Sequence, residues 1–549
     1  MAKTLKITAE RLDLGISSPS SATSSPSAEP FPQHLEPSTA STWKPWQKVL
    51  FRIAFVFFVS MSLPNNLDWY KEVFTFEWLQ LHYRDLYDVA RFGSGLNFFG
   101  NTIFGSNLNG YAVWIITLIF ATVVGFVWTG IAAYRQKERA EYNLMYYWLK
   151  VIVRYRAGIG IIGFGFTKLT PTQLPYPSWG ILNTDFGDLT LQKIYWLSIG
   201  IVPWYEVFTG VVEVLAGAFL FFRATTFWGA VLLFGALADI VYVNFAYDGG
   251  VHVYSSYFVL FSAFLLVDYI LKLYNLLILE KYTFPTTYYP VFSEAWQRIT
   301  RITLKTATII IFLPVFTYLA VINFLYDPYK QPALKGIPEL RGNYNVTEFK
   351  LNNQVIPYSP LDTVRWQQAT FEKWTTLTYK VNKPVELDLS NGGGAPMRDI
   401  NRTFELSGVA GGQRVFYYEA DTVHKTLYLQ DKNRENRQEG REFLGNRTDF
   451  GGDGRTNAAA KKKDEKPKED HWIPKEALAI IGPEDPKIES IVRSARRTKG
   501  IQAEESRPAK RNHMVLNYEV LNGGARVVLS GINENKDSIR VVLDRYDKK

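Results

Sequence analysis

The sequence predicts an all-α polytopic membrane bundle of about seven transmembrane helices, followed by a small extracytoplasmic β-rich domain. Three observations predict this class. The long apolar segments of the 549-residue chain nearly all lie before Tyr326. After Lys330 the pattern changes to short runs that alternate apolar and polar residues, which is typical of antiparallel strands. Lys and Arg also gather in particular loops, as they do on the cytoplasmic side of membrane proteins.

The composition excludes several function classes. The chain contains no cysteine, which excludes disulfides, cysteine nucleophiles and cysteine-ligated zinc or iron–sulfur centres. A large extracytoplasmic domain without disulfides favours a bacterial source. The formal net charge is +9, but surplus Lys and Arg in a membrane protein are typical of cytoplasmic loops, so we expect no nucleic-acid partner.

Changes in composition divide the chain into five segments. The first is charged and then Ser/Pro/Thr-rich, with no apolar signal-peptide core. The segments are residues 1–43, a disordered cytoplasmic tail; 44–330, the transmembrane bundle; 331–430, the first part of a periplasmic β-rich domain; 431–512, a charged disordered insertion; and 513–549, the final strands of that domain.

Seven apolar runs are expected to span the membrane. They are residues 47–63, 111–134, 151–169, a fourth run that begins between 194 and 204 and reaches 222, then 227–246, 251–270 and 306–326, the last kinked at Pro314. Basic residues in the loops at 135–156 and 272–305 place those loops in the cytoplasm. The N-terminus is then cytoplasmic, the C-terminal domain is periplasmic and the membrane is the bacterial inner membrane. The aromatic-rich residues 65–110 are expected to lie on the membrane surface.

Three carboxyl groups lie within the expected spans, and two of them, Glu213 and Asp239, are candidate catalytic or proton-handling groups. Glu206 and Glu213 are seven residues apart, so two helical turns bring them to one face. Asp239 lies at a similar depth on the next antiparallel helix and could neighbour Glu213. Such carboxyls suit proton relay, hydrogen bonding to a quinone or cation binding. The alternative is an interhelical hydrogen bond that only stabilises packing.

A second polar group is expected toward the outer face, where it could line a pocket beneath the β-rich domain. Its members are Lys168, Glu206, Asn244, Asp248 and His252. His252 is the only histidine in the expected spans, so we expect no multi-histidine metal or haem site. A histidine beside carboxylates could act as an acid or base, although a hydrogen-bonding role is the alternative.

Three arginines are expected on the cytoplasmic side of the bundle. Arg154, Arg156 and Arg223 could hold anionic lipid head groups. The alternative is that their guanidinium groups only reach toward the interface as anchors.

Three stretches resemble the DoxX-like membrane protein family, in particular its larger Bacteroidota members with an extracytoplasmic C-terminal domain. They are RYRAGIGIIGFGFTKLTPTQLPYPSWG (154–180), WYEVFTGVVEVLAGAFLFFRATTFWGA (204–230) and VNFAYDGGVHVYSSYFVLFSAFLLVD (243–268). The positions that match the family pattern are Lys168, Gln173, Glu213, Arg223, Asn244 and Asp248. The resemblance implies a quinone-linked redox role and a ligand site at these residues, and it implies that lysine is common where this chain has His252. The architecture also resembles HTTM proteins, which are related to vitamin K-dependent carboxylase, without a match to the catalytic lysine region of that enzyme.

The expected function is that of an accessory or quinone- or lipid-interacting subunit of a membrane redox or envelope complex. Its partners would be membrane lipids and other membrane or periplasmic subunits, and a quinone is the cofactor that the resemblance implies. The alternative is a non-catalytic membrane anchor or scaffold whose periplasmic β-domain binds a partner protein. A transporter is disfavoured because no inverted repeat is visible.

Overall fold

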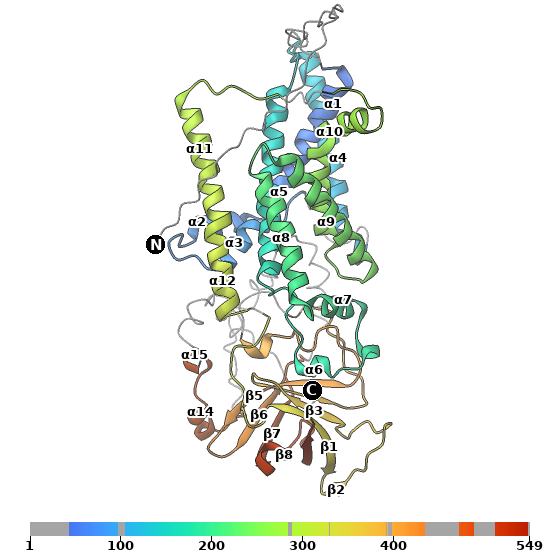
Figure 1. Cartoon of the computed structure of the whole chain (residues 1–549), viewed down its shortest axis with the longest axis vertical. Helices are drawn as coiled ribbons and strands as arrows, with labels where there is room; N and C mark the ends of the chain where they lie inside the picture. The colour runs from blue at the N-terminus through green and yellow to red at the C-terminus, as the bar shows by residue number, and fades with distance from the viewer. Residues whose placement is uncertain are drawn as a thin grey trace, which may run out of the picture.

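The computed structural model describes residues 43–96, 105–283, 288–328, 330–390, 392, 398–433, 472–487 and 511–546. The predicted N-terminal tail therefore lies outside the described residues, except for Trp43. Along the long axis of the molecule, a helical part stands over a β-rich part (Figure 1). This confirms the predicted order of a helical region followed by a β-domain.

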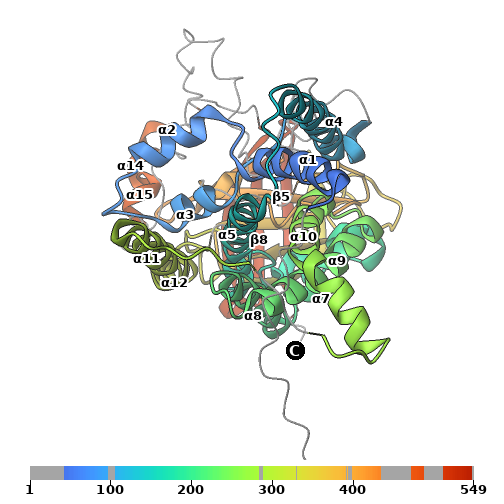
Figure 2. The ribbon, with the colours of Figure 1, turned by 90° about the horizontal axis from the view of Figure 1, so that it is seen from above.

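The helical part follows the apolar runs of the sequence. Its long helices are α1 (Pro45–Ser62), α4 (Gly105–Tyr134), α5 (Asn143–Leu169), α8 (Pro203–Leu220), α9 (Thr226–Ala246), α10 (His252–Leu277) and α11 (Ala295–Ile310), which continues through η2 (Ile311–Val315) into α12 (Phe316–Tyr326). Proline stands in the first turn of α1 and of α8, where a missing backbone N–H costs nothing. Pro314 instead lies in η2, a π-helical turn that absorbs it within one continuous rod. Figure 2, seen along the bundle axis, shows α5 surrounded by the other long helices.

Four helices of the described chain are long and apolar enough to cross a membrane. They are α4 from Tyr111, α9, α10 and the α11–α12 rod, and a fifth is added if α7 (Leu191–Gly200) and α8 form one span bent by 91°. Seven spans were expected. The helices α1 and α5 match the first and third expected spans but are not among the four, and both carry basic side chains within their apolar runs.

The aromatic-rich segment after α1 differs from its prediction. It forms α2 (Leu67–Thr75) and α3 (Tyr83–Ala90). Leu67 and Phe74 on α2 are exposed, as expected of a surface segment. The helix α3 instead packs into the bundle, because Leu86 and Ala90 belong to a buried apolar cluster with Phe316 of α12.

The segment between α5 and α8 forms a platform for the β-domain. It contains α6 (Trp179–Leu182), η1 (Phe186–Asp188) and α7. Leu189 forms a β-bridge with Val409, and the backbone N–H of Thr190 donates to the Gly408 carbonyl at 3.0 Å. Residues 170–192 therefore form a structured connection between the two parts.

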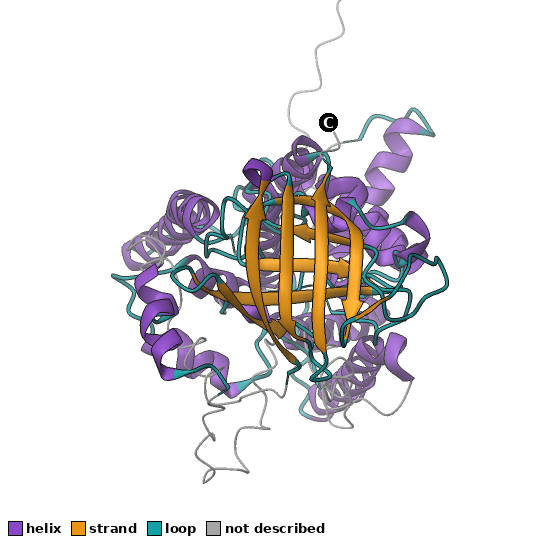
Figure 3. Cartoon of the chain, turned by 90° about the horizontal axis from the view of Figure 1, so that it is seen from below, coloured by secondary structure: helices purple, strands orange, loops and turns teal. Residues whose placement is uncertain are grey.

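The β-domain is a closed antiparallel barrel of eight strands. The strands are β1 (Gly342–Leu351), β3 (Gln368–Phe371), β4 (Thr376–Lys380), β5 (Gln413–Asp421), β6 (Thr426–Asp431), β7 (His513–Leu521), β8 (Arg526–Ile532) and β9 (Ser538–Arg545), with the short β2 (Gln354–Val355) paired to β1. Pairing of β1 with β9 closes the barrel, and Figure 3 shows one layer of strands crossing the layer behind it. Closure leaves none of these eight strands with a free edge. Inside, the rings of Trp366 and Tyr379 stack with centroids 3.7 Å apart.

The prediction of disorder across residues 431–512 is wrong for part of that range. Residues 434–471 and 488–510 lie outside the described residues. Between them, α14 (Lys475–Ile481) packs on the barrel, because Ile473, Ala477 and Ile481 bury their side chains against Tyr428 of β6. These apolar residues recur at helical spacing within a highly charged segment, so the charge of the surrounding segment concealed them.

Candidate functional site

Close packing of α5 against α8 brings the candidate residues together. A Cβ atom on Gly210 would lie 2.3 Å from the backbone nitrogen of Leu169, and one on Gly165 would lie 2.6 Å from a Val214 methyl group. The helices therefore touch backbone to backbone at these positions. This contact leaves Lys168, at the end of α5, directly opposite Glu213.

Lys168 and Glu213 form an ion pair that is largely buried. The Lys168 ammonium donates to Glu213 Oε1, and the Glu213 side chain is only 2% exposed. The second carboxylate oxygen, Oε2, is buried and has no hydrogen-bond partner among the described residues. Because a buried acceptor without a donor costs free energy, this oxygen is available to a ligand or a proton.

Glu206 lies two turns earlier on α8 and is fully buried. Its Oε1 accepts a hydrogen bond from the backbone N–H of Leu174 at 2.9 Å, whereas its Oε2 is buried without a partner in the described chain. Gln173 lies beside it and accepts a hydrogen bond from Thr167 at 3.1 Å through its side-chain oxygen. Lys168, Gln173, Glu206 and Glu213 thus form one polar group, which we name the junction group, between the bundle and the barrel.

Two further lysines approach from the barrel side, and neither was predicted from the sequence as a site residue. The Lys330 ammonium donates to the Gln173 carbonyl at 2.6 Å and lies 5.0 Å from the centre of the Trp196 ring. The buried Lys193 donates to the Phe404 carbonyl at 2.6 Å. The sequence does carry one signal for Lys193, which lies inside the apolar run that follows Thr190. A lysine in such a run is unusual unless the segment contacts another polar surface.

The other members of the predicted outer pocket lie at the turn between α9 and α10. Asn244 donates to the Ile240 carbonyl at 2.7 Å and accepts from the Val251 N–H at 3.4 Å, so it holds the turn together. The His252 ring packs against Phe245, with centroids 4.4 Å apart. Asp248 is exposed and adopts a positive φ of 52°. The structure therefore places these three residues on a different element from the junction group.

Asp239 is not the partner that Glu213 uses. Its side chain is exposed on α9, whereas Glu213 is buried against α5. Counting residues along two antiparallel helices predicts how far along the axis each residue lies. It does not predict in which direction around the axis the side chain points. The Lys168 ammonium takes the place expected for a second carboxyl group.

The three arginines predicted to hold lipid head groups divide into two kinds. Arg154 donates to Thr226 at the start of α9 at 3.3 Å, and Arg223 is exposed beside the Tyr289 ring. Arg156 is only 6% exposed and donates to the carbonyl of Ala90 at 3.0 Å. The structure therefore places Arg156 beneath α3 and not on the predicted cytoplasmic surface.

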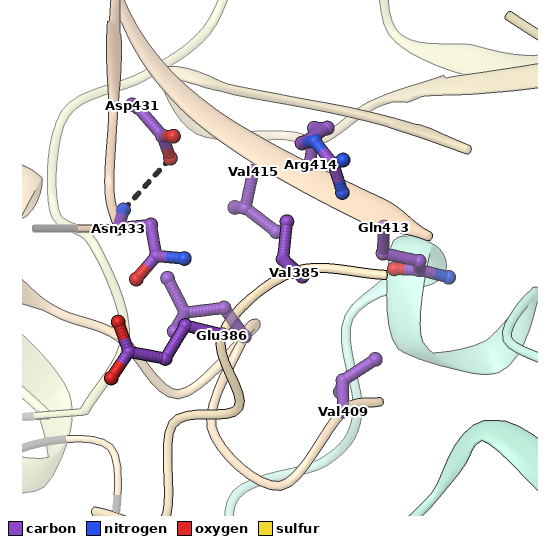
Figure 4. A pocket seen from close by; sticks show the side chains of 9 residues that line it. Val385, Glu386, Val409, Gln413, Arg414, Val415, Asp431 and Asn433 are labelled. Carbon is purple, nitrogen blue, oxygen red and sulfur yellow. Dashed lines mark hydrogen bonds between the residues drawn. The ribbon is translucent and has the colours of Figure 1, made fainter. Parts of the chain in front are cut away.

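Two cavities lie away from the junction group. One is an apolar groove of about 640 Å³ between α1, α4 and α10, lined by Ile53, Phe57, Trp114 and Leu118 among others. The other, in the β-domain, measures about 20 Å³ and is lined by Glu386, Gln413, Arg414 and Asp431 (Figure 4). The second holds no more than about one water molecule.

In the part of the chain that the structure describes, no three His, Asp or Glu side chains gather in a way that could hold a metal ion.

Neither a protein-family model, nor a curated protein, nor a solved structure matches this chain. Among the described residues, the junction group is one place where buried charge and unsatisfied acceptors coincide.

Proposed function

We propose that the protein is a DoxX-like bacterial inner-membrane protein that binds a quinone or quinol at the junction group, as an accessory subunit of a membrane redox or envelope complex. The observation that carries this proposal is that one buried carboxylate oxygen of Glu206 and one of Glu213, beside the Lys168 ammonium, have no hydrogen-bond partner among the described residues. A quinol hydroxyl can donate to such an oxygen, and an ammonium can donate to a quinone carbonyl. The junction group can therefore form hydrogen bonds with both the reduced and the oxidised form of a quinone.

The membrane arrangement belongs to the same proposal. The first and third expected spans, α1 and α5, would cross with the four apolar helices and with α8, which gives seven spans. Basic loops would then face the cytoplasm and the barrel would lie in the periplasm. In this arrangement the junction group lies where the bundle meets the barrel, near the outer membrane–water interface.

Quinone content of the purified protein tests the binding proposal. The protein is extracted in mild detergent, and its quinone is measured by solvent extraction, chromatography and absorbance. We expect quinone in the wild type and in Asp239→Asn, because Asp239 is exposed. We expect at least about a tenfold loss in Glu213→Gln, the equivalent of about 1.4 kcal/mol. Wild-type protein without quinone, whose thermal unfolding is also unchanged by added menaquinone and ubiquinone analogues, would sink the proposal.

A second candidate function is a scaffold whose barrel binds a partner protein. One observation favours it: the segment from β2 towards β3 exposes Val355, Tyr358 and Leu361, the last by 81%. Exposed apolar residues that gather on one loop are typical of a contact surface. The double variant Tyr358→Ser/Leu361→Ser should then lose a co-purifying subunit that Glu213→Gln retains. The reverse pattern would favour the quinone site.

A further inference from the structure

Two arginines lie inside the helical bundle where α3 meets α5 and α10: Arg156 is buried and Arg91 is half-buried. Arg156 on α5 donates to the backbone carbonyls of Ala90 at 3.0 Å and Phe92 at 3.4 Å. Arg91 follows α3 directly and donates to the Tyr87 hydroxyl at 2.5 Å. Figures 1 and 2 both show α3 beside α5, on the side where the α11–α12 rod stands.

Aromatic rings surround both guanidinium groups. Arg91 lies 4.8 Å from the centre of the Phe164 ring and 5.3 Å from that of Tyr254. Arg156 lies 3.8 Å from the Phe92 ring centre and 5.2 Å from that of Tyr257. These ring faces partly stabilise the two cations but carry no net charge.

Neither guanidinium has a carboxylate partner among the described residues. Other buried or half-buried arginines in the bundle do: Arg52 lies 2.6 Å from Glu138, and Arg84 lies 3.0 Å from Asp88. The Nε atoms of Arg91 and Arg156 are also buried without a hydrogen-bond partner in the described chain. Positive charge in an apolar bundle is strongly unfavourable unless an anion neutralises it.

We propose that Arg91 and Arg156 bind a phosphate-type oxyanion, presented either by a phospholipid head group or as a free ion. The planar guanidinium fork matches the oxygens of a phosphate, and the residual Nε donors are available to it. Gly160 makes room for this site, because a Cβ atom there would lie 2.8 Å from Arg156 Nη1.

This site is independent of the quinone proposal. Arg156 precedes Lys168 by twelve residues on the same helix, so the two lie about 18 Å apart along its axis. Within the described chain, the junction group offers acceptors without a donor, whereas the arginine site offers donors without an acceptor. A protein that fails to bind quinone could therefore still bind the anion, and a protein that fails to bind the anion could still bind quinone.

Native mass spectrometry and thermal unfolding in phosphate-free detergent test this inference. The probes are inorganic phosphate, phosphatidylglycerol and, as a lipid without net charge, phosphatidylcholine. We expect the wild type to carry or be stabilised by phosphate, by phosphatidylglycerol or by both. Stabilisation by phosphatidylglycerol alone would assign the head group as the source, and stabilisation by phosphate would assign the free ion.

Variants separate the site from general lipid effects. Arg156→Gln and Arg91→Gln should weaken the response at least about tenfold, since each removes a charge-assisted contact. Gly160→Ala should weaken it while keeping both charges, and Arg84→Gln, on α3 but paired with Asp88, should preserve it. Wild-type protein with no bound anion and no response to either anionic probe would overturn the inference. So would an equal response to phosphatidylcholine, or an equal loss in Arg84→Gln.

Discussion

Lys168 at the end of α5 and Glu213 in the middle of α8 form an ion pair with each other across a helix contact made by glycines. The pair is largely buried, and Glu213 retains one oxygen without a partner among the described residues. The pair therefore contributes to packing while it leaves an acceptor for a ligand or a proton.

Removal of one member of this pair should destabilise the protein. Glu213→Gln leaves the Lys168 ammonium buried without its carboxylate, which we expect to cost about 3 kcal/mol or more. The double variant Lys168→Met/Glu213→Gln should be more stable than Glu213→Gln alone, because no uncompensated charge remains. Thermal unfolding in detergent measures both. Lys150→Gln, which breaks a more exposed pair with Asp268, is the control and should cost at most about 1 kcal/mol. Equal effects of the two single variants would contradict the role of burial.

The glycine at position 210 should be intolerant of any side chain. Gly210→Ala places a methyl group against the Leu169 backbone, so α8 must move away from α5 and we expect a loss of about 1–3 kcal/mol. Gly235→Ala on α9 is the matched control, because no atom lies within 4 Å of its added Cβ. This control should gain up to about 1 kcal/mol from helix propensity. The two unfolding temperatures should move in opposite directions, and movement in the same direction would be evidence against the close contact.

The barrel should lose stability as pH rises toward neutrality. Burial raises the pKa of Glu372 to about 7 from an ordinary value of 4.5, against the hydrogen bond that its carboxylate accepts from the Gly180 N–H at 2.7 Å. The folded state therefore holds this proton between pH 4.5 and about 7 when the unfolded state does not, so stability falls through that range and is level above it.

Glu372→Gln should remove that part of the pH dependence, since a neutral amide still accepts from Gly180. Unfolding of the full chain at several pH values, wild type against variant, measures the difference, which we expect to be on the order of 1–3 kcal/mol. The other titratable groups contribute equally to the pH dependence of stability in both proteins, so their contributions cancel in the difference. Two parallel curves would show that Glu372 titrates normally.

Arg402 should hold the barrel to the end of the helical part. It is fully buried, lies 2.7 Å from Asp327, which follows α12, and also reaches Asp399 at 3.4 Å. Arg402→Met leaves both carboxylates buried without their cation, so we expect a loss of at least about 3 kcal/mol. Limited proteolysis should cut between Asp327 and Gly342 faster than in the wild type. Arg526→Met, which removes an exposed pair with Asp544, should leave the rate unchanged.

The sequence alone determined the properties that are local in the chain. Long apolar runs predict helices and alternating runs predict strands, because each pattern reflects the side-chain period of its own element. The same local geometry places Glu206 and Glu213 on one face of α8, and the structure buries both.

Only the tertiary structure decided which elements face each other. The rotation of α9 exposes Asp239, the folding of α3 over α5 buries Arg156, and the platform after α5 brings Lys193 to the barrel. Each of these contacts joins residues that are distant in the chain, and it depends on how whole elements rotate and dock. Periodicity within one element carries no information about that rotation, so the partner of Glu213 could be learned only from the packed bundle.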